Sequence, residues 1–92
     1  MKVLKKSPGE SWETIDIEND LGVLQEAVGG YIEAYTFCND AAVICNEEGR
    51  LMDLPFNCWY LGMDWHGTIL IVGITGEEFC GLTDEQIKFL VK

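Results

Sequence analysis

The sequence predicts one α+β domain over residues 1–92, with a small antiparallel or mixed sheet of about five strands, an early helix and a C-terminal helix. Three observations lead to this prediction. The length of 92 residues suits one domain with a thin core, and a hydrophobic content of 48% is too high for a disordered chain. Short alternating or apolar runs indicate strands that follow one another. Helical spacing with capping residues occurs only near the start and at the end, and we expect both helices to pack on one face of the sheet.

The first part of the chain contains two strand patterns and a helix pattern. Residues 3–4 belong to a first strand that ends at the turn signal in 7–10, and residues 12–17 alternate cleanly as a second strand. Asn19-Asp20 then offers side-chain oxygens for a helix N-cap. Apolar residues in 21–28 follow at helical spacing, and Gly29-Gly30 ends the helix.

The middle of the chain reads as further strands separated by turn residues. Strands are expected at 31–37 and 41–45, and a third at 50–54 that ends at Pro55. Residues 68–74 are apolar at both odd and even positions. This pattern is typical of a central strand that is covered on both faces.

The C-terminal helix has the clearest local signature. Residues 83–86, Thr-Asp-Glu-Gln, fit a capping box, and Leu82 with Ile87 fits the hydrophobic staple that accompanies it. Lys88 and Lys92 stand where positive charge opposes the negative end of the helix dipole.

The charge of the chain is strongly asymmetric. The net charge is −10, and between Ser7 and Ile87 there are sixteen carboxylates but only one base, Arg50. Such a body is repelled by nucleic-acid backbones and anionic lipid, so we expect no direct nucleic-acid or membrane binding. Three interpretations remain open: solubility, a docking surface for a basic partner protein, and imitation of the phosphate rows of DNA.

Cysteine usage and the chain start indicate a cytoplasmic protein. The start lacks the apolar run of a signal peptide, and the longest apolar stretch, 69–74, is too short to cross a bilayer. The sequence has four cysteines without paired spacing, Cys38, Cys45, Cys58 and Cys80, and we expect them to be reduced, buried and inert thiols. With only one histidine beside them, we expect no metal site.

No motif for catalysis or cofactor binding occurs, so we expect a protein that is not an enzyme and holds no cofactor. The acids Asp16, Glu18 and Asp20 have the spacing of a calcium loop, but Leu21 and Ala27 stand where that loop requires glycine and glutamate. A cysteine–histidine pair for nucleophilic catalysis would need His66 beside one of the thiols, which sequence alone leaves open.

Two aromatic segments supply the candidate binding residues. Residues 56–66 hold four aromatic side chains, and we expect a loop or short helix that either completes the core or contacts a partner. One face of the 31–37 strand carries two tyrosines beside a glutamate. The candidates for partner or ligand binding are Tyr31, Glu33, Tyr35, Trp59, Tyr60, Trp65 and His66.

Several segments, taken in order, resemble the DUF3846 family, an uncharacterised domain of phages, plasmids and conjugative elements of bacteria. They are LQEAVGGYIE (24–33), NEEGRL (46–51), LPFN (54–57), GTILIVG (67–73), and Phe79 with LTDEQI (82–87). The resemblance spans nearly the whole chain and implies an accessory protein of a mobile element, in a family whose members are occasionally fused to antirestriction modules. It carries no catalytic residues over to this chain.

The sequence therefore favours a small acidic interaction module of a phage or mobile element that binds a basic host or element protein, and an anti-defence or DNA-mimic-like role is one form that this binding can take. The alternative is a sponge or sensor for a small molecule or nucleotide signal, with a pocket made by Tyr31, Tyr35, Trp59 and Trp65. The oligomeric state stays open, and a homodimer is one option.

Overall fold

The computed structural model of the chain describes residues 1–91, and Lys92, which was expected to oppose the helix dipole, lies outside the described residues. The elements follow in the order β1 (Lys2–Lys6), β2 (Glu13–Asp16), α1 (Leu21–Val28), β3 (Ile32–Cys38), β4 (Ala41–Asn46), β5 (Phe56–Tyr60), β6 (Met63–His66), β7 (Ile69–Thr75), β8 (Glu78–Cys80) and α2 (Asp84–Leu90).

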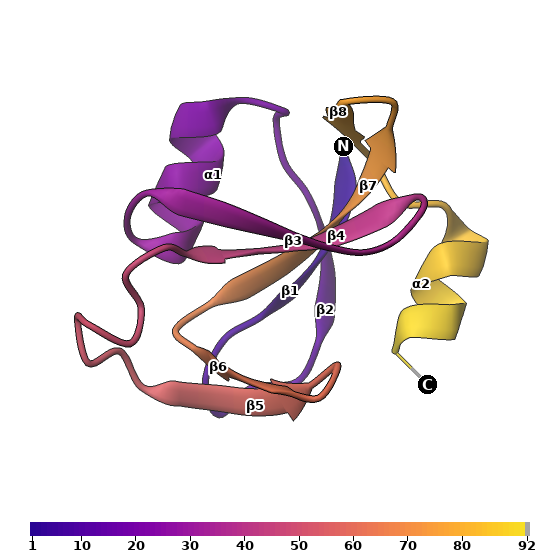
Figure 1. Cartoon of the computed structure of the whole chain (residues 1–92). Coiled ribbons are helices and arrows are strands. Elements are labelled where there is room, and N and C mark those ends of the chain that lie inside the picture. Colours follow the sequence, from indigo (N-terminus) through magenta and orange to yellow (C-terminus); the bar gives the residue numbers. More distant parts are fainter. Residues whose placement is uncertain (92) are drawn as a thin grey trace.

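The predicted α+β class is confirmed, and every strand pair in residues 1–91 is antiparallel. The main sheet has the strand order β2-β1-β7-β4-β3, and the short strand β8 also pairs with β7. Strands β5 and β6 form a separate two-stranded sheet below the main one in Figure 1. Strands β2 and β3 therefore form the two edges of the main path.

The central position predicted for residues 68–74 is also confirmed, because β7 lies between β1 and β4. Its side chains point alternately to the two faces of the sheet and pack into two different hydrophobic clusters. Leu70 and Val72 pack in a first cluster with Leu24 of α1, whereas Ile69 and Ile71 pack in a second cluster with Trp65 of β6. A strand that is buried on both faces needs apolar residues at both parities, which explains the continuous run.

The two helices lie against opposite faces of the sheet, so the expectation that both pack on one face is wrong. Helix α1 contributes Leu24 and Val28 to the first cluster. Helix α2 packs Ile87 and Leu90 against the second cluster, which also receives side chains of the β5–β6 hairpin. Figure 1 shows the two helices on either side of the strands.

Both predicted helix caps are present. The Asp20 side chain accepts a hydrogen bond from the Val23 amide, at 3.1 Å, and the Thr83–Gln86 capping box is complete. Leu82 and Ile87 share the second core cluster, as a hydrophobic staple requires. Neither of the two helices in residues 1–91 has the length and apolar character needed to cross a membrane.

Two strand assignments need correction. Residues 50–53 form turns and Leu54 lies outside any strand, and Asp53 has a positive φ of 55° that interrupts extended backbone. Residues 56–66 form a β-hairpin instead of a loop or short helix. Its turn is Leu61-Gly62, with φ of 55° and 74°, and two successive positive φ angles are typical of tight hairpin turns.

Candidate functional site

A pocket of about 450 Å³ lies where β3, β6 and the connection between β4 and β5 meet. We call it the β3–β6 pocket. Extended β3 backbone places Glu33 and Tyr35 on the same face, because side chains alternate along a strand. The lining residues are Glu33, Tyr35, Cys45, Asn46, Glu47, Gly49, Arg50, Leu51, Met63, Asp64, Trp65 and His66.

Two aromatic rings form the apolar part of this pocket. Tyr35 and Trp65 meet edge to face, with ring centroids 6.0 Å apart and an interplanar angle of 87°. Trp65 is only 4% exposed and donates its indole N–H to the Tyr60 carbonyl at 2.9 Å. The buried Trp65 ring therefore packs against one side of the half-exposed Tyr35 ring, whose exposed part faces solvent.

A second part of the pocket is an ionic group built on Asp64. One Asp64 oxygen accepts a hydrogen bond from Arg50, and the other lies 3.0 Å from Nε2 of His66. The other ring nitrogen of His66 lies 3.3 Å from the Leu54 carbonyl oxygen. The hydrogen bond from His66, assisted by the Arg50 charge, lowers the pKa of the Asp64 carboxyl below its ordinary value. Arg50 is therefore already neutralised within the pocket.

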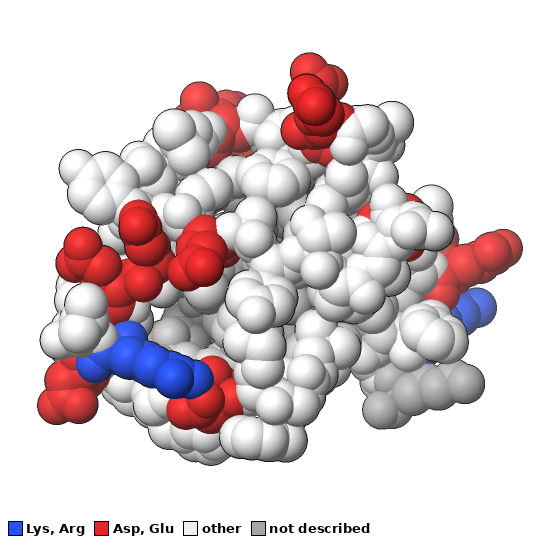
Figure 2. Space-filling view, in the orientation of Figure 1, with Lys and Arg blue, Asp and Glu red and all other residues white. Residues whose placement is uncertain are grey.

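The remaining two carboxylates of the pocket, those of Glu33 and Glu47, have no ion-pair partner among residues 1–91. Figure 2 shows acidic side chains gathered around a single basic one beside the connection that follows β4, where the surface is hollowed. The pocket thus combines uncompensated negative charge with an aromatic surface.

Cys45 lies in the same pocket but is a poor nucleophile. Burial, with a smaller effect from the Glu33 carboxylate, raises the pKa of the Cys45 thiol to about 11. The thiolate, which is the reactive form, is therefore scarce at neutral pH. The ring nitrogens of His66 lie next to the Leu54 and Asp64 oxygens, and no hydrogen bond joins His66 to Cys45 within residues 1–91.

The expectation of four buried thiols holds only in part. Cys45, Cys58 and Cys80 are partly buried, but Cys38 is exposed. The Cys38 side chain lies 3.3 Å from an Asp40 carboxylate oxygen in the turn between β3 and β4, where solvent reaches it. The correction follows from β3 being an edge strand, which leaves its last residue uncovered.

The β3–β6 pocket unites four of the seven candidate residues, namely Glu33, Tyr35, Trp65 and His66. Tyr31 and Trp59 do not line it, and their side chains are 70% and 69% exposed. Four residues were expected to form one pocket, Tyr31, Tyr35, Trp59 and Trp65, and only Tyr35 and Trp65 of these line the same pocket. Of the two hairpin tryptophans, Trp65 belongs to the core and Trp59 lies on the surface, because their side chains point to opposite sides of β5–β6.

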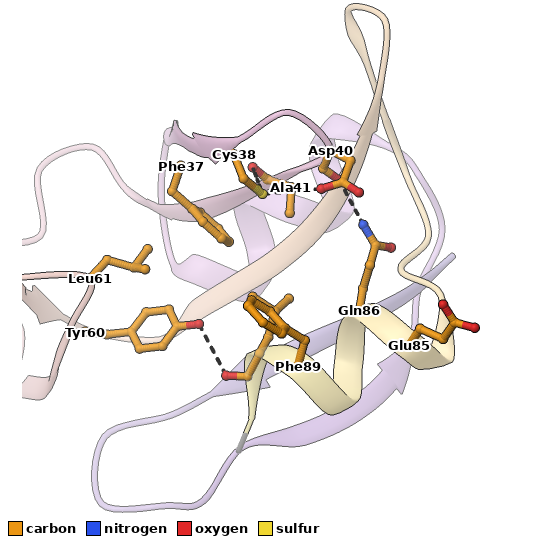
Figure 3. Close-up of a pocket in the computed structure, with 10 residues that line it drawn as sticks. Phe37, Cys38, Asp40, Ala41, Tyr60, Leu61, Glu85, Gln86 and Phe89 are labelled. Atoms are coloured by element: carbon orange, nitrogen blue, oxygen red, sulfur yellow. Dashed lines mark hydrogen bonds between the residues drawn. The ribbon is translucent and has the colours of Figure 1, made fainter.

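Tyr60, the seventh candidate, lines a different and more apolar pocket of about 690 Å³ between α2, the hairpin tip and the turn that joins β3 to β4. We call it the α2 pocket. The Tyr60 hydroxyl donates to the Leu90 carbonyl, 3.4 Å away, and the Gln86 amide donates to the Asp40 carbonyl, 3.3 Å away. Dashed lines in Figure 3 mark hydrogen bonds from Tyr60 and from Gln86. Burial, followed by the Cys58 and Cys38 thiols, raises the pKa of Tyr60. The pocket is lined by Phe37, Cys38, Asp40, Ala41, Tyr60, Leu61, Glu85, Gln86, Phe89 and Leu90.

Sequence reasoning missed the ionic part of the β3–β6 pocket. Arg50 and Asp64 are 14 residues apart and meet only because the hairpin folds back toward the β4–β5 connection. Arg50 as the single base within a long acidic span was a usable signal, but its partner could not be chosen among sixteen carboxylates. Within residues 1–91, no group of three or more histidine, cysteine or acidic side chains is arranged to hold a metal ion.

Comparison with known proteins supports the resemblance that the sequence motifs carry. The profile of a domain of unknown function, DUF3846, matches residues 1–92. No curated protein and no solved structure matches the chain. Because the match covers the whole sequence, the chain belongs to the DUF3846 family.

Proposed function

We propose that this protein is an interaction module that binds a basic segment of a partner protein at the β3–β6 pocket. The observation that carries the proposal is the pairing state of the pocket charges. Its one base, Arg50, is taken up by Asp64, whereas Glu33 and Glu47 have no counter-charge in residues 1–91. A lysine or arginine from a partner supplies that charge.

The aromatic surface suits the same kind of ligand. An arginine guanidinium can stack on the exposed side of the Tyr35 ring while it pairs with Glu33 on the same strand face. The buried Trp65 ring already packs against Tyr35 in the free protein, which limits the side-chain freedom that binding removes. The overall charge of −10 adds long-range attraction for a basic partner and speeds encounter at low salt.

The test uses a peptide too short to form a strand, Gly-Arg-Arg-Gly, titrated into the labelled full chain and followed by NMR. We expect shift changes centred on Glu33, Tyr35, Glu47 and Trp65, and weaker binding at about 200 mM than at about 20 mM NaCl because salt screens exposed charge. The double variant Glu33→Gln/Glu47→Gln should bind about fivefold more weakly, since two exposed ion pairs are lost.

The matched control is Glu77→Gln/Glu78→Gln, which removes the same net charge from the turn before β8 and from the first residue of β8, outside the pocket. It should weaken binding by less than about twofold, because only the general field changes. Equal losses for the two double variants would contradict the proposal, since binding would then depend on net charge and not on this site.

The wider setting is part of the same proposal. We infer a non-enzymatic, cytoplasmic accessory protein of a phage or other mobile element, whose basic partner is a protein of the host or of the element. Mimicry of DNA is one form that this binding can take, because a protein that grips DNA phosphates presents arginine and lysine side chains. Duplex DNA itself should not bind, owing to repulsion by the net charge of −10.

A second candidate function is binding of a small apolar molecule in the α2 pocket. Its volume of about 690 Å³ lies in the usual range for ligand sites, and its lining is dominated by aromatic and aliphatic side chains. Asp40 and Glu85 at its rim make a phosphate-rich nucleotide a poor fit and a neutral or cationic molecule a better one. A thermal-shift screen of metabolites and nucleotides tests this, with Leu61→Asp expected to abolish any stabilisation.

A further inference from the structure

The outer edge of β3 is open along a regular stretch of backbone. Strand β3 is the last strand on the main path of the sheet, and within residues 1–91 it pairs only with β4, on its inner side. Most of its residues are exposed, including Ala34, Tyr35 and Thr36. The ladder with β4 is regular from Ile32 to Thr36 and shifts only between Thr36 and Cys38.

Hydrogen-bond parity shows which backbone groups face outward. The Glu47 amide donates to the Tyr31 carbonyl at 2.8 Å, so residues 31 and 47 form a hydrogen-bonded pair. Hydrogen-bonded pairs alternate along an antiparallel ladder, so Glu33 and Tyr35 also direct their N–H and C=O groups at β4. Ile32, Ala34 and Thr36 therefore direct theirs away from the sheet, and the structure records no partner for them among residues 1–91 at this edge.

The other edge of the sheet is protected, which makes the open edge of β3 distinctive. Strand β2 has only four residues, and two of them, Glu13 and Asp16, are charged. Strand β3 has seven residues, contains no proline or lysine, and carries a single charge at Glu33. Natural proteins usually block a free edge with charge, proline or short length, because an unblocked edge pairs with other strands.

We propose that a basic, extended segment of the partner adds to the β3 edge as a further strand; this rests on the function proposed above and specifies how the partner is held. Its backbone bonds to Ile32, Ala34 and Thr36. Every second side chain then lies on the face of Tyr31, Glu33 and Tyr35, beside the β3–β6 pocket, and these side chains are lysine or arginine.

Charge selects this occupant over a second copy of the chain. Two copies would bring together two bodies of net charge −10, each with its unpaired Glu33 and Glu47 near the joined edge. A basic strand instead places positive side chains opposite Glu33 and beside the two tyrosine rings. Facing side chains in such a pair lie close enough for ion pairs and cation–π contacts.

The test uses the full chain with the peptide Thr-Arg-Val-Arg-Val-Arg-Thr and a control peptide of the same composition, Arg-Arg-Arg-Val-Val-Thr-Thr. The alternating peptide should bind at least about tenfold more tightly, because only it places all three arginines on one face of a strand. Its binding should slow hydrogen exchange of the Ile32, Ala34 and Thr36 amides. The Glu33 and Tyr35 amides, already bonded to β4, should change little.

A variant of the edge isolates the backbone contribution. Ala34→Pro removes an outward N–H and leaves the ladder to β4 intact, since proline is tolerated at such edge positions. It should lower affinity for the alternating peptide by about tenfold or more while its binding of Gly-Arg-Arg-Gly stays unchanged. The matched variant Ala34→Val keeps the N–H and should bind as the original chain does.

The outcomes separate this inference from the function on which it rests. Equal binding of the two seven-residue peptides, or unchanged affinity of a folded Ala34→Pro variant, overturns strand addition while side-chain recognition stands. If Gly-Arg-Arg-Gly does not bind the original chain at the β3–β6 pocket, both the proposed function and strand addition are overturned. A dimer of the free chain that Ala34→Pro converts to a monomer identifies a second copy as the occupant and overturns the basic-segment proposal.

Discussion

Glu33 and Cys45 face each other across the β3–β4 pair, where the carboxylate adds to the effect of burial on the thiol. Together they raise the pKa of Cys45 from 9.0 to about 11. Both residues line the β3–β6 pocket, so the reactivity of the Cys45 thiol reports on the Glu33 carboxylate.

Cys45 should react slowly with alkylating reagents at about pH 8, and its rate should rise steeply only near pH 11. Glu33→Gln should increase the rate at about pH 9 by a few fold, because it removes the smaller of the two causes. Mass spectrometry of a chain whose other three cysteines are serine measures this. An unchanged rate in the variant would show that Glu33 does not act on the thiol.

The same shift predicts how stability depends on pH. The folded-state pKa of Cys45 is raised, so the unfolded chain loses this proton first as pH increases. The stabilisation that the protonated Cys45 thiol adds to the free energy of unfolding is therefore complete below pH 9, and it is lost as pH rises from 9.0 toward about 11. Urea unfolding of the original chain and of Cys45→Ala across this interval should show a steeper loss in the original chain.

Asn57→Ala should destabilise the protein by about 2–3 kcal/mol, because Asn57 anchors the hairpin to the main sheet. Its side-chain amide donates to the carbonyls of Lys6 and Gly67, at 2.8 Å each, and its oxygen accepts from the Lys6 ammonium. Asn57 is 8% exposed, so water cannot replace these bonds. The control is Asn39→Ala at an exposed turn, expected to change stability by less than about 0.5 kcal/mol. Similar losses in urea unfolding for both variants would contradict the anchoring role.

Gly73→Ala should cost about 3 kcal/mol, since a methyl group there overpacks the contact between β7 and β8. A Cβ at residue 73 would lie 2.8 Å from both the Cys80 sulfur and the Gly81 carbonyl oxygen. Gly76→Ala is the comparison: its φ of +64° is unfavourable for alanine, but no neighbouring atom of residues 1–91 lies within 4 Å of the added Cβ. That variant should lose only about 1 kcal/mol. Thermal unfolding that ranks Gly76→Ala as the more damaging change would refute the close approach of β8.

Tryptophan fluorescence should separate the two faces of the hairpin. Trp59 is exposed and Trp65 is buried, so acrylamide should quench mainly the Trp59 signal, with a smaller part from the partly buried Trp12. Trp59→Phe should remove most of the quenchable emission and leave stability nearly unchanged. Trp65→Phe should lower the melting temperature, since it removes buried area and the hydrogen bond to Tyr60. Greater quenching in the Trp59→Phe variant would reverse this assignment.

The parts of the fold that the sequence predicts well are those fixed by neighbouring residues. Asp20 caps α1 and Thr83 caps α2 through contacts only three residues long. The double-parity apolar run of β7 likewise needs no knowledge of its partners to be recognised as central. Helix placement was predicted incorrectly because it depends on strand order, which the local sequence does not contain.

The hairpin was missed for a local reason. Its two-residue turn requires positive φ at both positions, and the sequence there is Leu61-Gly62. Asparagine, aspartate or glycine is the usual first residue of such a turn, so leucine concealed it. The candidate site was consequently found in halves. Glu33 and Tyr35 were visible on one strand and Trp65 and His66 on another segment, but Arg50–Asp64 required the hairpin to be known.

The position of β7 has a consequence for synthesis of the protein. During translation β1 and β4 are made before β7, the strand that lies between them. Leu4 of β1 and Val43 of β4 both pair with Ile71 of β7, so neither pair can form until Ile71 is available. Both core clusters contain β7 side chains, Leu70 and Val72 in the first and Ile69 and Ile71 in the second, so neither core is complete before residues 69–75 are made. Folding is then a late, single event in which both cores close around one strand, and a chain truncated before β7 should be cleared by proteases instead of persisting as a partial domain.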